Sequence, residues 1–436
     1  MNYILRRAAV PTEHGWQQKD IVISNKSIRA ISPPGSESGE GMDAKGLAAF
    51  PGLIDVHVHL NEPGRTDWEG MHSGSKALAA GGVTTYFDMP LNSAPPTSTA
   101  ARLKQKQQLA EVKSCIPGRF WGALMPTSVE SLQEMHEARA IGFKAFMSRA
   151  GTDDFHHADD ETLLRGMEKI AALGSILAVH AESDHLINWL TTKAREESRE
   201  SMKDYEQTRP IQAEVEAVER VLLYAEWTGC RTHICHISSG AAAEDVRRAK
   251  DRGVAVTAET CPHYLSISLE EAEEIGTLAK CAPPLRTEAE REKLWQALED
   301  GTLDLISSDH SPAPAAMRDG TVLRAWGGIA GAQQTMDVLL TEGLYKRGIS
   351  PQQLIQWTHT APAAIFGLHE KRGLTEGSSA DITLVDLSIS RELREAELLQ
   401  KHKESPYIGR TFRGKVVWTM AVGQIVFEAA KQGERM

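Results

Sequence analysis

The first 50 residues alternate apolar and polar positions over short stretches and show no long helical periodicity. The stretches 3–9, 20–24 and 27–31 have the period of two that is typical of β-strands. Pro33, Pro34 and Gly35 interrupt the pattern after the third of them. We therefore expect this part of the chain to form short strands joined by turns.

From residue 50 onward, short apolar stretches alternate with amphipathic stretches of helical period. Eight of the apolar stretches are candidate strands: 53–60, 83–89, 120–125, 142–147, 176–182, 232–237, 254–260 and 303–309. Helical stretches such as 211–228 and 241–251 lie between them. Strands and helices in alternation indicate parallel βαβ units. Eight such units over about 300 residues are typical of a (β/α)8 barrel.

The strand pattern of the N-terminal part returns beyond Gly367. A turn-rich segment at 372–377 precedes apolar stretches at 380–386, 415–419 and 424–428. Each chain end is too short to bury a core by itself. The sequence therefore predicts an α/β protein with a (β/α)8 TIM barrel over residues 51–370. One small β-sandwich, built by residues 1–50 and 371–436 together, would flank the barrel.

The composition is that of a globular protein, and it excludes several classes of function. Of the 436 residues, 41% are hydrophobic and 25% are charged, and the net charge of −11 disfavours a nucleic-acid surface. No apolar stretch approaches the ~20 residues that span a bilayer, and the N-terminus lacks the apolar segment of a secretory signal. The five cysteines are scattered and lack Cys-x-x-Cys spacing, which argues against disulfides and thiolate zinc sites. We expect a cytoplasmic protein that binds neither nucleic acid nor membranes.

Two histidines mark the end of the first candidate barrel strand. The apolar run that begins at Pro51 leads into His57 and His59, which share a face because alternate side chains of a strand point the same way. Two neutral imidazoles on one face form half of a metal site. An isolated His-x-His pair is equally compatible with a strand end that binds no metal, so the other strand ends decide between the two interpretations.

Four further strand ends carry a side chain that can bind a metal. Chemistry in a barrel of this kind lies at the carboxyl ends of the strands. There the sequence places Lys144, His180, His236 and Asp309. Each has an ordinary alternative, namely a lysine that extends to the barrel mouth, a buried core histidine, or an aspartate that caps a turn. A shared metal centre explains all six side chains at five strand ends more simply.

This set of residues resembles the metal centre of the amidohydrolase superfamily. Its motifs resemble the cyclic-amidohydrolase branch, which holds dihydroorotases, hydantoinases and allantoinases, and the resemblance covers essentially the whole chain. It implies a homodimer or homotetramer with two divalent metal ions per subunit, zinc being expected and cobalt, nickel or manganese the alternatives. The implied ligands are His57, His59 and Asp309 for one ion and His180 and His236 for the other. Lys144, carboxylated by CO2 to a carbamate, would bridge both.

The chemistry of amide hydrolysis is consistent with such a centre. A buried lysine beside two cations is readily neutral, and CO2 converts it to an anionic oxygen ligand. Metal coordination lowers the pKa of water from about 15.7 to about 7. The resemblance therefore implies a metal-bridging hydroxide as nucleophile, with Asp309 carrying the proton to the leaving nitrogen.

Two positions distinguish the substrates within this branch. Dihydroorotases carry an arginine two residues after the second histidine and an asparagine after the Met-Pro of the second strand, and both bind the substrate carboxylate. This chain has Asn61 and Leu91 at those positions. The runs 61–70, 278–286 and 325–331 are instead similar to allantoinases. The resemblance implies the hydrolysis of allantoin, an uncharged cyclic ureide, to allantoate in purine catabolism.

Asn61 and Cys281 are the residues that we expect to contact the substrate. Cys281 is also explained as a small buried apolar residue, and His263 is either a neighbour of the metal ligands or structural. The alternative enzymes are a hydantoinase or dihydropyrimidinase, or a dihydroorotase, acting on a related cyclic ureide. A different kind of hypothesis is a non-catalytic assembly protein of the same fold, which would be recognised by missing metal ligands.

Overall fold

A ring of parallel strands forms the centre of the larger unit of the protein. In the computed structural model, which describes residues 2–430, six strands pair in the order β14-β13-β12-β11-β10-β9 and three in the order β6-β7-β8. Only Trp121 separates β8 from β9, and a parallel bridge between Val58 and His310 joins the two ends. The strands are β6 (Leu53–Val58), β7 (Val83–Asp88), β8 (Gly118–Phe120) with β9 (Gly122–Ala123), β10 (Phe143–Phe146), β11 (Ile176–His180), β12 (Arg231–Ile234), β13 (Val256–Thr260) and β14 (Leu305–Ile306).

Each of these strands lies at one of the eight apolar stretches, so the predicted barrel is confirmed. The eighth strand is shorter than the predicted 303–309, because the chain turns after Ile306. There the carboxylate of Asp55 accepts a hydrogen bond from the backbone N–H of Ser308 at 3.1 Å, and Asp309 adopts a φ of 44°. A positive φ is incompatible with a continuing strand. The turn places Asp309 at the carboxyl end of the barrel.

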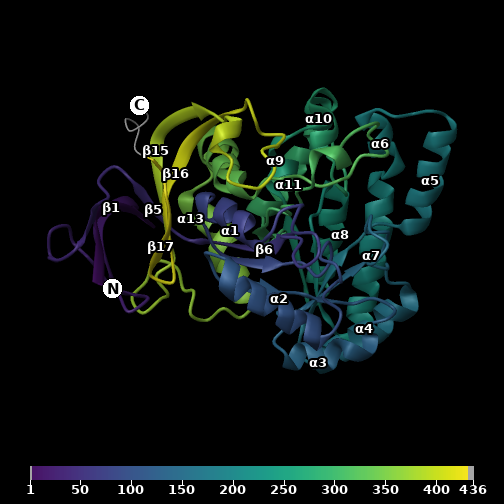
Figure 1. The fold of residues 1–436 in the computed structure, drawn as a ribbon, viewed down its shortest axis with the longest axis horizontal. Helices are drawn as coiled ribbons and strands as arrows, with labels where there is room; N and C mark the ends of the chain where they lie inside the picture. The colour runs from purple at the N-terminus through teal and green to yellow at the C-terminus, as the bar shows by residue number, and fades with distance from the viewer. Residues whose placement is uncertain (1, 431–436) are drawn as a thin grey trace.

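Helices surround the strands on the outside of the barrel (Figure 1). The helix predicted at 211–228 is present with those bounds, since Ala217, Val221 and Ala225 recur on its buried face and Gly229 ends it at a φ of 69°. The helices that follow the barrel strands are α1 (Met71–Ala80), α2 (Ala100–Lys113), α3 (Leu132–Glu137), α4 (Asp160–Ala172), α7 (Ile211–Thr228), α8 (Gly240–Asp251), α11 (Glu288–Glu299), α12 (Thr335–Val338), α13 (Pro351–Ile355) and α14 (Ala361–Ile365).

Further helices lie at the carboxyl end of the barrel and in its connections. The pair α5 and α6 follows β11 and packs together. These helices are α5 (Asp184–Glu196), α6 (Met202–Thr208), α9 (Pro262–Ser266) and α10 (Leu269–Ile275), and two π-helical turns cover Leu339–Tyr345 and Gln356–Thr360. Below the site the barrel is packed with aromatic rings, because Phe366 lies 5.0 Å from Phe87 and 5.5 Å from Trp121 between ring centroids.

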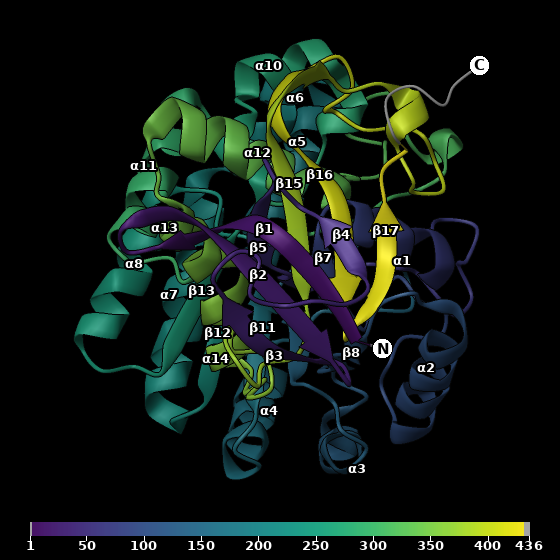
Figure 2. The ribbon, with the colours of Figure 1, turned by 90° about the vertical axis from the view of Figure 1, so that its left-hand side faces the viewer.

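The two chain ends build the smaller unit together, and Figure 1 and Figure 2 show the first strands and the last ones side by side. The strands pair in the order β17-β16-β15-β5-β1-β2-β3, with β4 on β1. The sheet folds over on itself, because Tyr3 of β1 stacks on Trp418 of β16 at 6.4 Å. The strands are β1 (Asn2–Thr12), β2 (Gly15–Ser24), β3 (Ser27–Ser32), β4 (Gly41–Asp43), β5 (Ala48–Pro51), β15 (Ile382–Glu392), β16 (Thr411–Ala421) and β17 (Gln424–Glu428).

The segment 393–410, between β15 and β16, reaches back over the barrel. The backbone N–H of Lys401 donates to the fully buried carboxylate of Glu69 at 3.1 Å, and His402 lies 2.8 Å from the carbonyl oxygen of Asp67. These contacts hold the loop that follows the first barrel strand. Among the described residues, no helix combines the length and the hydrophobicity that crossing a membrane requires.

Candidate metal centre

The carboxyl ends of the barrel strands bring the predicted ligand side chains together. The ring centroids of His57 and His59 are 5.4 Å apart, those of His57 and His236 5.3 Å, and those of His180 and His236 4.7 Å. The Asp309 carboxylate lies 3.1 Å from Nε2 of His59 and 3.3 Å from Nε2 of His57. Residues from four strand ends, separated by up to 252 positions in the sequence, therefore share one small volume.

The backbone departs from regular strand geometry where these side chains begin. The pairing of β6 with β7 shifts its register between Asp55 and Val58, around His57. His236 and Asp309 have φ values of 39° and 44°, which few residues other than glycine adopt. Register shifts and positive φ values re-aim side chains and are concentrated at functional sites. Here these departures turn the side chains of His57, His236 and Asp309 toward the centre of the barrel mouth.

Lys144 completes the cluster as a buried amine without a partner. It extends from β10, is fully buried, and its Nζ has no hydrogen-bond partner. The ring centroid of Phe146 lies 5.1 Å from the amine. Within residues 2–430 no carboxylate forms an ion pair with Lys144. A buried amine without a partner is unfavourable, so Lys144 is a candidate for chemical modification or for a role as a ligand.

The three most buried histidines of the cluster are neutral at pH 7. Burial lowers the pKa of His57, His180 and His236 below the usual range. Burial also raises the pKa of Asp309, but the neighbouring His57 and His59 outweigh this and hold the pKa at about 2. Neutral imidazoles beside an ionised carboxylate are the protonation states that bind divalent cations.

Two buried glutamates hold the outer nitrogens of the imidazoles. Glu259 lies 2.5 Å from Nδ1 of His57, and Glu182 lies 2.8 Å from Nε2 of His180. A carboxylate requires a donor, so the proton of each ring sits on that nitrogen and the other nitrogen offers a lone pair. The free lone pairs then lie on Nε2 of His57 and on Nδ1 of His180. Nδ1 of His180 lies 3.0 Å from Nε2 of His236. The sequence analysis missed both glutamates, although Glu182 follows His180, the last residue of β11, by only two positions.

The donor set fits divalent cations. Nε2 of His57 and Nδ1 of His236 are buried without a hydrogen-bond partner, and donor atoms of His57, His236 and Asp309 lie within 4.8 Å of one another. His57, Cys235 and Glu259 form a second such group. In that group Glu259 is already bonded to His57, and burial raises the pKa of the Cys235 thiol to about 12, so it does not offer a thiolate. The first group is the better candidate for a metal.

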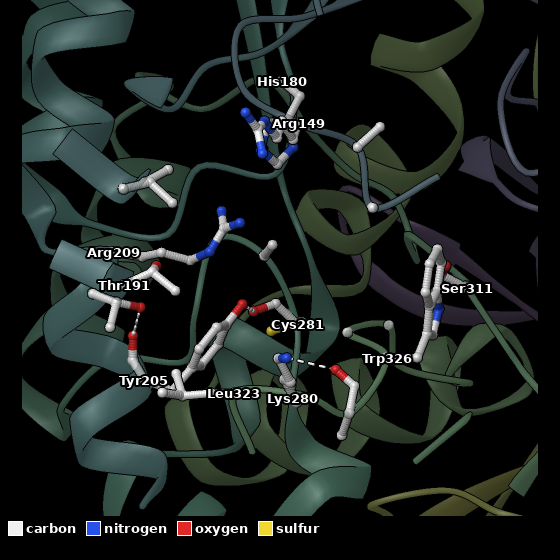
Figure 3. Close-up of a pocket in the computed structure, with 18 of the residues that line it drawn as sticks. Arg149, His180, Thr191, Tyr205, Arg209, Lys280, Cys281, Ser311, Leu323 and Trp326 are labelled. Carbon is white, nitrogen blue, oxygen red and sulfur yellow. Dashed lines mark hydrogen bonds between the residues drawn. The ribbon is translucent and has the colours of Figure 1, made fainter. Parts of the chain in front are cut away.

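A cavity of about 940 Å3 opens above the cluster (Figure 3). Its floor includes His57, His59, His180, His236 and Asp309, and helices α5 and α6 form one wall. Leu91 and Cys281 also line it. Five cationic side chains line the cavity as well, a feature that the sequence analysis did not anticipate: Arg149, Arg195, Arg209, Lys280 and Arg324.

The residues expected to contact the substrate differ in their positions. Cys281 lies on the cavity wall, and burial raises the pKa of its thiol to about 12, so it is a neutral group there. Asn61 is buried outside the cavity lining, and its side-chain amide donates to the carbonyl of Pro312 at 3.2 Å. His263 is also buried outside the lining, where burial lowers its pKa to about 4. It lies close enough to Asp309 to lower the pKa of that carboxyl.

Known proteins share this architecture over nearly the whole chain. A family model described as the amidohydrolase family matches residues 48–426. The chain is 43% identical over 431 residues to an allantoinase of Rubrobacter xylanophilus, covering 98% of this chain and 95% of the relative. It is 44% identical over 427 residues to an allantoinase of Bacillus velezensis, covering 98% and 94%. The solved L-hydantoinase (dihydropyrimidinase) from Arthrobacter aurescens superimposes with a TM-score of 0.95 at 30% identity, covering 99% of this chain and 97% of that one.

Removal of the buried amine tests whether Lys144 takes part in metal binding. We expect Lys144→Ala to lose bound metal and nearly all hydrolytic activity, because alanine offers no ligand atom in place of the lysine side chain. Added formate or acetate should restore part of the metal content and part of the activity, because the small acid fills the space left by the lysine side chain. Metal content by mass spectrometry and turnover are measured on one sample, with Lys104→Ala, an exposed change on α2, as the control. Full metal content and wild-type turnover in Lys144→Ala would contradict the assignment.

Proposed function

The chain belongs to the amidohydrolase family, and from this premise we propose that it hydrolyses the cyclic amide bond of allantoin to give allantoate. The observation that carries the proposal is the cluster of neutral imidazoles, the ionised Asp309 and the unpaired Lys144 beneath an open cavity. The identity of 38–44% with proteins named allantoinase supports this substrate.

Membership of the family implies the use of a divalent metal, and we propose two ions in each subunit. When bound, such ions supply Lewis acidity to the amide carbonyl and lower the pKa of water. Zinc is the expected metal, with cobalt, nickel or manganese as alternatives. The proposed ligands are His57, His59 and Asp309 for one ion, His180 and His236 for the other, and Lys144 as a carbamate for both.

Other residues are proposed to transfer the proton, to orient the imidazoles and to limit the access of water. Asp309 is ionised at neutral pH, so it can accept a proton from the attacking water and deliver it to the leaving ring nitrogen. Glu259 and Glu182 hold His57 and His180 in one tautomer and orientation. Helices α5 and α6 cover one side of the cavity and limit the access of bulk water.

Two residues of the cavity lining suit an uncharged ring. Leu91 offers an apolar contact, and Cys281 offers a neutral thiol. A Cβ atom at Gly327 would lie 3.7 Å from Lys280, so the backbone at 327 is open for close approach of a ring. Asn61 is proposed to act indirectly, by holding Pro312 just beyond Asp309.

A hydantoinase is the second candidate function, because the likeness to the L-hydantoinase of Arthrobacter aurescens extends over 99% of the chain. We also propose a cytoplasmic homodimer or homotetramer. Trp189 and Trp227 are 62% and 72% exposed, and large exposed aromatic side chains are enriched where subunits meet.

A substrate panel tests the proposed activity. We expect kcat/KM to be highest for allantoin, lower for hydantoin and dihydrouracil, and at least about 100-fold lower for dihydroorotate. The carboxylate of dihydroorotate would lie beside the apolar Leu91, whose side chain offers it no hydrogen bond. Steady-state rates are measured for the four compounds on one preparation of known metal content. A preference for dihydroorotate would refute the assignment, and a preference for hydantoin would favour the second candidate.

Replacement of Asp309 tests its assignment as proton carrier. Asp309→Asn keeps the shape and one oxygen but cannot accept a proton, so turnover of allantoin should fall at least about 100-fold. Rates are compared at equal metal content, and folding is followed by circular dichroism. Asp319→Asn is the matched control, since Asp319 is an exposed carboxylate at the cavity edge and should change the rate less than about 3-fold. Near-normal turnover of Asp309→Asn would place the proton transfer elsewhere, and His263 would be tested next.

A further inference from the structure

One wall of the cavity gathers cationic side chains, among them Lys280 and Arg209 (Figure 3). Lys280 is only 7% exposed and donates a single hydrogen bond, from Nζ to the carbonyl of Ala325 at 2.5 Å. Its amine lies 4.7 Å from the ring centroid of Tyr205, and the guanidinium carbon of Arg209 lies 5.9 Å from the same centroid. Two cations therefore share one aromatic ring on the cavity wall.

The surroundings of Lys280 are electrostatically unfavourable for its charge. Burial, together with the positive charges of Arg209 and Arg195, lowers the pKa of Lys280 to about 7. Within residues 2–430, no carboxylate forms an ion pair with Lys280 or with Arg195. Arg209 is paired with Glu182, which is also bonded to His180. Two of the three hydrogen-bond donors of the Lys280 ammonium remain without a protein acceptor.

A buried cation without a partner costs stability, and such groups are concentrated at ligand sites, where a bound ion compensates them. The cavity has room for such a ligand. Its volume of about 940 Å3 is near the upper end of the ~300–1,000 Å3 range of ligand clefts. A ring the size of allantoin cannot fill it, so space remains beside Lys280 while the reaction centre is occupied.

We infer that Lys280, with Arg195 and Arg209 beside it, forms an anion subsite that binds the carboxylate of an open-chain ureido acid. The identity of that acid rests on the proposed function. Hydrolysis breaks the ring C–N bond, forms a C–O bond, adds one proton to the ring nitrogen and releases one proton from the new carboxylic acid. The neutral substrate thereby becomes a carboxylate anion. The subsite retains this anion after it leaves the reaction centre, and it gives the neutral substrate no comparable contact.

The test measures the binding of allantoate to the metal-loaded protein by titration calorimetry. Lys280→Met should weaken binding about 10-fold or more, the loss expected for a hydrogen bond to a charged group. Lys280→Arg keeps the charge and should bind within about 3-fold of the wild type. Lys193→Met is the matched control, because Lys193 is an exposed lysine on α5 outside the cavity lining, and its allantoate affinity should equal that of the wild type.

Two further measurements distinguish the possible causes of a lower allantoate affinity in Lys280→Met. Acetate is titrated in parallel. If acetate binds more weakly than allantoate and its binding also depends on Lys280, the product is the preferred anion. If acetate and allantoate bind with equal affinity, the subsite accepts carboxylates in general. Thermal unfolding without added carboxylate should give Lys280→Met a melting temperature at or above that of the wild type, because a buried unpaired charge is removed. A lower melting temperature would assign Lys280 a structural role through Ala325 and overturn the inference.

Different results would refute the anion subsite at Lys280 and the proposed hydrolysis of allantoin. Equal affinity of folded Lys280→Met and wild-type protein for allantoate would overturn the subsite, even if allantoin is hydrolysed. Lys280-dependent binding of allantoate by a protein that does not turn over allantoin would keep the subsite and refute the proposed activity.

Discussion

Closure of the barrel between its first and last strands is the constraint on which the site depends. The bridge between Val58 and His310, which are 252 positions apart, is accompanied by a hydrogen bond of 2.8 Å from the N–H of His59 to the carbonyl of His310. The buried carboxyl of Asp55 adds a hydrogen bond to the N–H of Ser308. Without these contacts Asp309 would not meet His57 and His59. The chemistry at the mouth is thus a consequence of how the strands close.

The site separates two electrostatic environments within one cavity. At the floor, lone pairs of neutral imidazoles and an ionised carboxylate face one another and attract cations. On the wall, Lys280 and its neighbouring arginines attract anions. The link between them is Glu182, which bonds to both His180 and Arg209. A reaction that starts from a neutral ring and ends in a carboxylate suits this arrangement, since substrate and product differ in charge.

The strand and helix order could be read from the sequence because the apolar stretches are short, strongly patterned and regularly spaced. The side chains at the strand ends followed from that order, since parallel strands of a barrel end at one face. Glu259 was missed because an acidic residue near the end of an apolar strand has no local signature, and its role appears only when His57 lies 2.5 Å away. The cationic wall was missed for a similar reason, because Arg195, Arg209 and Lys280 come from three segments whose meeting depends on α5 and α6. Asn61 shares the barrel mouth with the ligands but contacts Pro312, a detail of loop packing that no pattern predicts.

The most direct test of the central claim is a crystal structure of the purified protein with anomalous diffraction recorded at the absorption edges of the candidate metals. We expect two anomalous-difference peaks, one for each metal ion, between His57, His59, His180, His236 and Asp309. We also expect Lys144 to carry an added carboxyl group that contacts both ions. A protein that turns over allantoin at its full rate, yet shows no metal among these side chains or a metal pair held elsewhere, would contradict the account.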